Sequence, residues 1–175
     1  LLECNRWADQ EDGNVYFYTP NLTPAIVVKE PDVMAGDANF EYVRNYMLTA
    51  EQVLFSANFA DPNVGWQKYM DMDSFVDWYL IHEMSKNVDC MFNFSTYMNL
   101  PRGGKLRMGP IWDFDIAYGN IKQSDSGYLK WVFPSGNLLS ATKWYSRLMK
   151  DPAFVAKLKE RFNYFYSHKN EFLTY

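Results

Sequence analysis

The sequence predicts an α+β fold in which helices dominate, because two different apolar patterns occupy separate stretches of the chain. Short runs of β-branched and aromatic residues, bounded by turn-forming residues, lie before residue 30 and again between residues 94 and 112. In other stretches apolar residues recur every three or four positions, as they do on one face of a helix. The length of 175 residues indicates a single domain.

Two short strands are predicted within residues 1–36. Residues 15–19 follow an Asp-Gly-Asn turn, and residues 25–29 follow Thr23 and Pro24. We expect these runs to pair as a hairpin, with Pro20 and Pro24 in the connection, where a missing N–H group costs little.

Two helices are expected next. The three- and four-residue spacing of apolar side chains predicts an amphipathic helix over residues 38–56. After the Asp-Pro-Asn break at residues 61–63, a second helix is predicted to begin with Asp73 and Ser74 as cap candidates and to run through Met84. Because this second helix is apolar on nearly every side, we expect it to be buried at the centre of the fold.

A second strand pair surrounds a glycine turn. Residues 94–98 and 106–112 flank Gly103 and Gly104, which predicts a β-hairpin. Residues 117–140 are long for a loop of a compact domain, so we expect this stretch to be functional or mobile. Two helices then close the chain, one near residues 143–150 and one that begins with Asp151 as its cap and Pro152 as its first residue.

Composition and charge exclude several classes of protein. The net charge of −4 and the isoelectric point near 5.2 give no basic surface for nucleic acid. No stretch approaches the ~20 apolar residues of a transmembrane helix. The two cysteines, Cys4 and Cys90, are too few for a disulfide framework, and we expect both to be free thiols.

Several familiar catalytic patterns are also missing. Two histidines, His82 and His168, are too few for a histidine-rich metal centre and argue against a Ser-His-Asp triad. His82 and Glu83 resemble the start of a zinc-protease motif, but Lys86 stands where its second histidine belongs, so we expect a structural role for His82. The Gly-Gly-Lys run at 103–105 lacks the rest of a P-loop and is interpreted as a turn.

The most informative segment is Gly-Pro-Ile-Trp-Asp-Phe-Asp at residues 109–115, followed by Gly119. If the strand continues to its end, alternation points the carboxylates of Asp113 and Asp115 to the same side. Two carboxylates beside a glycine loop suit Mg²⁺ or Mn²⁺ carrying a nucleotide. The alternative is structural, with Asp115 capping a turn and Asp113 forming an ion pair.

A third aspartate lies upstream, at the end of the buried helix. Asp89 follows Asn87 and Val88, and it either directs its carboxylate into a cleft or belongs to a turn whose side chains satisfy loose backbone groups. With Asp113 after the hairpin, the order is that of protein kinases, which place a catalytic aspartate before a metal-binding one.

These segments together resemble the CotH (spore-coat protein H) kinase family, in the version carried on exported proteins of gut-type bacteria. The resemblance rests on Asn-Val-Asp at 87–89 and Lys-Leu-Arg-Met-Gly-Pro-Ile-Trp-Asp-Phe-Asp at 105–115, and it extends over nearly the whole chain. It implies an atypical protein-kinase-like fold and transfer of phosphate from ATP to protein hydroxyl groups with a divalent metal, Mg²⁺ or Mn²⁺. It also implies that Asp89 is the catalytic aspartate, that Asp113 binds the metal, and that Asp115 is a second metal contact.

The chain departs from the family pattern at one ligand position. Many relatives place an asparagine about five residues after the catalytic aspartate, as a second metal ligand, and this chain has Phe94 there. Asn93 and Ser95 flank Phe94, and either of them could substitute as the ligand.

The resemblance also implies that the chain begins where the family's hinge enters the C-terminal lobe. Residues 1–175 would then be one truncated domain, with a hinge and hairpin region at 1–36 and a helical lobe at 37–175. Lys29 lies after that hinge, so we do not expect it to anchor phosphates. We expect the isolated chain to be inactive and to self-associate through its truncated face, and the parent protein to be extracellular or at the cell surface, where it modifies a protein substrate.

Two other functions stay open at this stage. Aromatic residues of the 117–140 stretch, such as Tyr128, Trp131 and Phe133, would suit a non-catalytic cell-surface or carbohydrate-binding module on the same scaffold. Asp-Phe-Asp also matches the short D-x-D pattern of nucleotide-sugar sites, which would indicate a glycosyltransferase.

Overall fold

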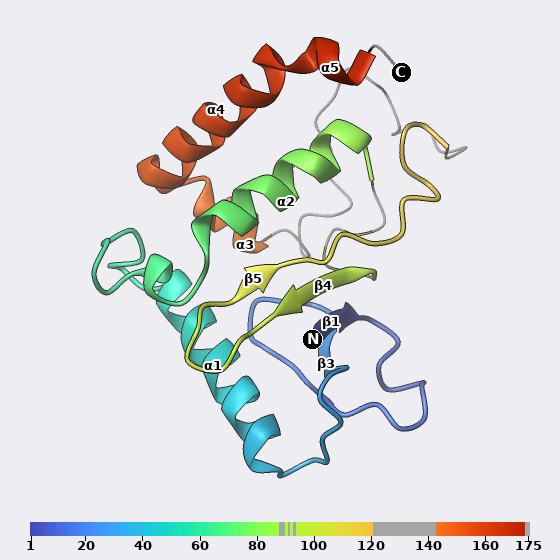
Figure 1. Ribbon diagram of the computed structural model, residues 1–175. Helices are drawn as coiled ribbons and strands as arrows, with labels where there is room; N and C mark the ends of the chain where they lie inside the picture. The colour runs from blue at the N-terminus through green and yellow to red at the C-terminus, as the bar shows by residue number, and fades with distance from the viewer. Residues whose placement is uncertain (88–89, 91, 93, 121–142, 174–175) are drawn as a thin grey trace.

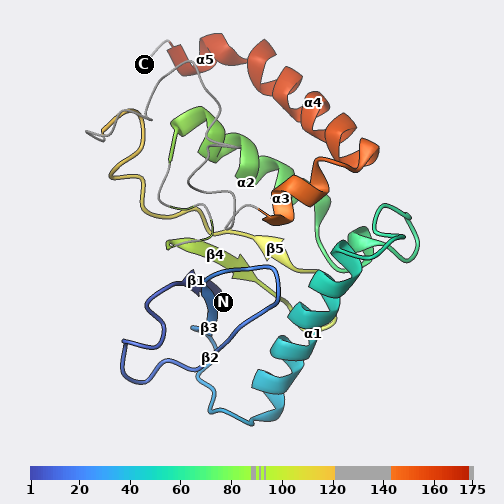
Figure 2. The same cartoon turned by 180° about the vertical axis from the view of Figure 1, so that it is seen from behind.

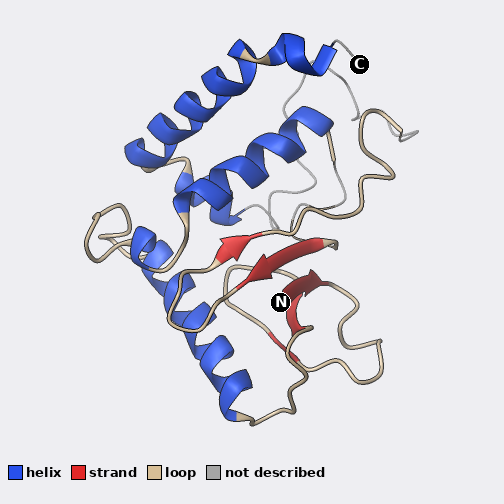
Figure 3. Ribbon diagram, in the orientation of Figure 1, coloured by secondary structure: helices blue, strands red, loops and turns tan. Residues whose placement is uncertain are grey.

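The computed structural model describes residues 1–87, 90, 92, 94–120 and 143–173 (Figure 1). Its elements are, in chain order, β1 (Leu2–Asn5), β2 (Tyr16–Phe17), β3 (Ala25–Val28), α1 (Ala38–Leu54), the short 3-10 helix η1 (Trp66–Lys68), α2 (Met72–Ser85), β4 (Thr96–Asn99), β5 (Arg107–Met108), α3 (Lys143–Leu148), α4 (Pro152–Ser167) and α5 (Lys169–Leu173). The chain is therefore α+β with helices in the majority, as predicted (Figure 3). No described helix is long and apolar enough to cross a membrane.

The five strands form one antiparallel sheet in the order β2-β3-β1-β4-β5. Both predicted strand pairs are confirmed: Tyr16 lies opposite Val27, and Met98 lies opposite Met108. The sequence analysis missed β1, which is the central strand. That run is only four residues long and carries Glu3 among its apolar residues, so it gives neither a clear alternation nor a flanking turn signal.

Helix α1 covers the predicted stretch and places Met47, Ala50 and Leu54 in the core. It also buries a carboxylate that the apolar pattern did not reveal. Glu51 is 1% exposed, and its oxygens accept hydrogen bonds from the Thr19 hydroxyl (2.8 Å), the Asn21 backbone N–H (2.9 Å) and the Trp144 indole N–H (2.7 Å). A buried carboxylate is tolerated only when its oxygens are well partnered, so Glu51 holds the β2–β3 connection, α1 and α3 in one arrangement.

Helix α2 is the buried central helix that the sequence predicts. Its core residues include Phe75, Val76 and Leu80, each at most 2% exposed. In both views α2, α3 and α4 lie on one side of β4 and β5, and α1 lies on the other (Figures 1 and 2). A bidentate ion pair joins α2 to α4, with Arg161 nitrogens 2.8 and 2.9 Å from the two carboxylate oxygens of Asp77.

The predicted start of α2 is wrong by two residues. The N-cap is Asp71, whose carboxylate accepts the backbone N–H of Ser74 at 2.9 Å. Ser74 therefore supplies the capped N–H group. Asp73, which the sequence analysis named as a cap candidate, lies instead in the first turn, where its charge suits the helix dipole.

The C-terminal helices follow the prediction more closely. Asp151 caps α4 and Pro152 is its first residue, as expected. The final helical stretch is interrupted at His168, after which α5 begins. Both cysteines are free, as predicted, and the structure buries them. Of the predicted loop at 117–140, residues 121–140 lie outside the described part of the chain, and with them Tyr128, Trp131 and Phe133.

Asp151 provides a test of this packing, because it is 2% exposed and serves two partners. One carboxylate oxygen accepts the Ala153 N–H (2.9 Å), and the other accepts the indole N–H of buried Trp66 (2.7 Å). We expect Asp151→Ala to lower the free energy of unfolding by about 2–4 kcal/mol, since it removes a cap and leaves a buried donor unpaired. Asp151→Asn keeps one acceptor oxygen and should cost less.

Urea unfolding followed by circular dichroism measures both effects. The exposed Asp9 gives the control, because Asp9→Ala removes the same charge from the surface. A loss below about 0.5 kcal/mol for Asp151→Ala, the range of ordinary surface substitutions, would contradict the assigned role.

Candidate functional site

The candidate site is built on the C-terminal end of α2. The last carbonyl groups of a helix lack partners within the helix, and here the helix end lies inside the molecule. Lys86 takes a left-handed conformation (φ 55°), and the backbone N–H groups of Lys86 and Asn87 both point to the carbonyl of His82. The carbonyl of Ser85 accepts the backbone N–H of Tyr118 at 2.6 Å. Tyr118, 33 residues further along the chain, thus supplies the hydrogen bond that the Ser85 carbonyl lacks within the helix.

That loop, residues 113–118, is held to α2 at two further points. The Asn87 side-chain amide donates to the backbone carbonyl of Asp113 at 2.8 Å. The ring of Phe114 stacks on the imidazole of His82, with centroids 5.1 Å apart and planes 16° apart. The backbone at and after Asp113 is therefore fixed, whereas the side chain of this residue is exposed.

Asp113 reaches this position by a turn, and the predicted strand alternation of Asp113 and Asp115 is wrong. Strand β5 ends at Met108, because Pro110 has no N–H group with which to continue the ladder. Asp113 then adopts a left-handed conformation (φ 60°). Its carboxylate accepts the hydroxyl of Ser95, which lies directly before β4, with Oγ 3.1 Å from Oδ2.

Backbone strain is concentrated around this site. Five non-glycine residues of the described chain have positive φ between 49° and 60°, and all lie within residues 86–95 or 113–118: Lys86, Phe92, Ser95, Asp113 and Tyr118. Such conformations are costly for residues with a Cβ atom and persist where the surroundings hold them, which is most often at functional sites. The same two segments carry the three aspartates that the sequence analysis selected.

The structure places these aspartates unequally. Asp89 lies outside the described residues, as does Asn93. Asp115 is exposed, and its backbone carbonyl accepts the side-chain amide of Asn120, so any metal contact of its carboxylate stays a prediction. Among the described residues no three His, Cys, Asp or Glu side chains come together as a metal site.

His82 supports the site from within the core. It is 1% exposed, its ring lies 4.2 Å from that of Trp78, and its Nδ1 lies 2.8 Å from the sulfur of Cys90. Its Nε2 has no hydrogen-bond partner in the described chain, and burial lowers the pKa of His82 to about 4. His82 is thus a neutral packing residue beneath Phe114.

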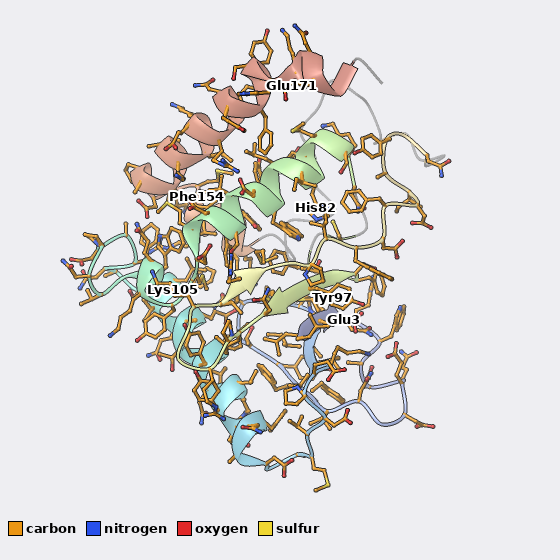
Figure 4. The ribbon with its side chains drawn as sticks, in the orientation of Figure 1. Glu3, His82, Tyr97, Lys105, Phe154 and Glu171 are labelled. Carbon is orange, nitrogen blue, oxygen red and sulfur yellow. The ribbon has the colours of Figure 1, made fainter. Side chains whose placement is uncertain are left out.

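The surface beside Asp113 is acidic and aromatic. Tyr97 on β4 donates its phenolic hydroxyl to Glu3 of β1 at 3.2 Å, and Figure 4 shows the two side chains next to each other. Burial raises the pKa of Tyr97, and the charges of Glu3, Asp113 and Glu11 raise it further. The Trp112 ring lies 6.5 Å from that of Tyr97 and is 60% exposed.

A cavity of about 490 Å³ lies elsewhere, between α2 and α4. Tyr79, Leu80, Leu158 and Phe162 contribute to its walls, and neither Asp113 nor Asp115 does. Its mostly apolar lining offers no set of groups for the chemistry that the aspartates suggest, so we place the candidate site at the Asp113 loop.

The sequence analysis named Asp113 as a metal ligand and Ser95 as one of two possible further ligands, but it did not predict that Asn87 holds the backbone of Asp113. The Asn-x-Asp pattern drew attention to Asp89 alone. The sequence did contain a signal for this role. A polar residue directly after a buried helix is expected to bind unpaired backbone groups, and Asn87 binds the carbonyl of Asp113.

Comparison with known proteins gives a finding at the level of the family. A family model described as CotH kinase protein matches residues 11–171, which is most of the chain. Neither the curated proteins nor the solved structures contain a match.

The low pKa of His82 predicts how acid affects this region. The unfolded chain takes up a proton near pH 6.5, whereas the folded chain does so only near pH 4, so protons favour unfolding between these values. We expect His82 to contribute full stability above pH 6.5 and to lose about 3 kcal/mol of it as the pH falls to 4. His82→Phe keeps a ring against Phe114 and removes the titration.

The measurement is the free energy of unfolding in urea at pH 7, 5.5 and 4 for both proteins. Carboxylates titrate in both, so the difference between the two pH profiles isolates His82. Parallel profiles would show that the buried imidazole is not the titrating group.

Proposed function

Because the chain belongs to the CotH kinase protein family, we propose that it takes part in metal-dependent transfer of the terminal phosphoryl group of ATP to a hydroxyl group of a protein. The observation that carries this proposal is the position of Asp113, exposed on a loop whose backbone is fixed to the end of α2 by Asn87 and Tyr118. Phosphoryl transfer depends chiefly on positioning and charge stabilisation, so a carboxylate on a rigid support suits it.

The side chains present fit a divalent metal of the magnesium type. The carboxylate of Asp113 and the hydroxyl of Ser95 are hard oxygen donors, and Asp115 adds a carboxylate two residues further on. Mg²⁺ commonly takes only one or two protein carboxylates and completes its shell with water and substrate phosphates. When bound, the metal would supply positive charge to offset that of the phosphates.

Asp113 and Asp89 then have separate tasks in the proposed reaction. Asp113 holds the metal and fixes its position relative to α2. Asp89 orients the acceptor hydroxyl and accepts its proton as the new oxygen–phosphorus bond forms and ADP leaves. Asn87, through the Asp113 carbonyl, is a positioning residue for this arrangement.

A second candidate function rests on exposed aromatic rings near the same loop. Trp7 is 45% exposed and packs on Phe94, next to Ser95, and Trp112 precedes Asp113. Exposed rings of this kind suit a non-catalytic module that binds carbohydrate or a cell surface. Loss of glycan binding in Trp112→Ala, together with its retention in Asp113→Asn, would favour this alternative.

The kinase proposal predicts the effect of Asp113→Asn. We expect phosphoryl transfer to fall at least about a hundredfold, or about 3 kcal/mol of transition-state stabilisation, because the amide no longer carries the charge that holds the metal. The melting temperature should change little, since the side chain is exposed. The assay is phosphate incorporation from labelled ATP, with Mg²⁺ or Mn²⁺, by the protein in its full natural length.

The matched control is Asp32→Asn, which alters an exposed aspartate between β3 and α1. Transfer by Asp113→Asn at the level of this control would refute the role of Asp113.

A further inference from the structure

Ser95 lies directly before β4, and Asp113 follows β5. The hydroxyl oxygen of Ser95 and a carboxylate oxygen of Asp113 therefore meet at the open end of the β4–β5 hairpin, 3.1 Å apart. We propose that Ser95 supplies its hydroxyl oxygen as a second protein ligand to the divalent metal held by Asp113. This inference rests on the function proposed above and commits to one residue as the second protein ligand.

The spacing of the two oxygens is the first argument. An octahedral Mg²⁺ ion binds oxygen at about 2.0–2.1 Å, which places neighbouring ligand oxygens about 3 Å apart. The 3.1 Å between Ser95 Oγ and Asp113 Oδ2 matches this edge of the octahedron. A serine hydroxyl has one hydrogen and two lone pairs, so its oxygen can face a cation while its hydrogen points elsewhere.

The second argument is that the two segments carrying these oxygens are anchored independently of each other. Thr96 follows Ser95, is fully buried, and its hydroxyl both donates to the carbonyl of Cys90 and accepts the backbone N–H of Phe92. This fixes the Ser95 side of the pair to the segment after α2. The side chain of Asn87, directly after α2, holds the backbone carbonyl of Asp113 and with it the 113–118 loop. The pair is therefore a preformed feature of two anchored segments.

The third argument concerns the neighbouring residue. Phe94 precedes Ser95, but a phenyl ring has no donor atom, and here its centroid lies 6.2 Å from that of Trp7. The guanidinium of Arg6 lies over both rings, at 5.2 and 5.6 Å from their centroids. Phe94 thus belongs to an aromatic cluster, whereas Ser95 presents a hydroxyl oxygen in contact with the Asp113 carboxylate.

The test measures Mn²⁺ binding by electron paramagnetic resonance of the free ion, using the protein in its full natural length and four variants. Ser95→Gly removes the hydroxyl without strain, because glycine accepts the left-handed conformation that Ser95 adopts (φ 49°). Ser95→Asn restores an oxygen ligand with a residue that also tolerates this conformation. Asp113→Asn removes the first ligand. Ser167→Ala removes a hydroxyl from the far end of α4 as the control.

We expect Ser95→Gly to weaken Mn²⁺ binding about tenfold, Ser95→Asn to restore at least most of it, and Ser167→Ala to leave it unchanged. Unchanged binding in Ser95→Gly, with binding lost in Asp113→Asn, would overturn the role of Ser95 and leave the proposed function intact. Weakened binding that Ser95→Asn does not restore would also overturn it, because the hydroxyl would then act only by orienting Asp113. Absence of Mn²⁺ binding by the unaltered protein would overturn both proposals.

Discussion

The burial of the C-terminal end of α2 is the constraint on which the candidate site depends. A helix end in water leaves its last carbonyl groups to solvent, but α2 ends within the protein, where an unpaired carbonyl is costly. The chain satisfies these groups with Lys86 and Asn87 from the next turn and with Tyr118 from a distant loop. Because α2 is fixed between β5 and α4, the loop that completes its end is fixed as well. The position of Asp113 thus follows from the need to pair the backbone carbonyl groups at the buried end of α2.

The contacts that anchor the loop do not use the carboxylate of Asp113. The contacts that hold the 113–118 loop use the carbonyl of Asp113, the ring of Phe114 and the N–H of Tyr118. The carboxylate of Asp113 takes no part in them and is available on the outer side. Because the backbone and an apolar ring provide these contacts, the exposed side chains of the loop can change without loss of its attachment to α2.

The sequence predicted what local patterns encode. The two hairpins, α1, the buried α2 and the Asp151 cap follow from periodicity and turn residues, and the family resemblance follows from the motif around Asp113. Two features depended on partners far along the chain. β1 is a strand because β3 and β4 flank it, and Glu51 is buried because Trp144 and Thr19 supply donors. A third feature has a local cause that the motif did not reveal, since Asp113 leaves the strand register because Pro110 ends the ladder before it. Asp89 stays a prediction from the motif.

The central place of β1 in the sheet has a consequence for synthesis of the protein. β1 can pair with β3 once the first 28 residues are available, but its other neighbour, β4, begins only at Thr96. At about 5–20 residues per second, a ribosome needs several seconds to make the intervening chain. During that interval the other edge of β1 has unpaired backbone groups, which can join a strand of another chain. Until the second hairpin has emerged, the nascent protein therefore presents an open strand edge to aggregation, and a chaperone that covers this edge would act at this stage.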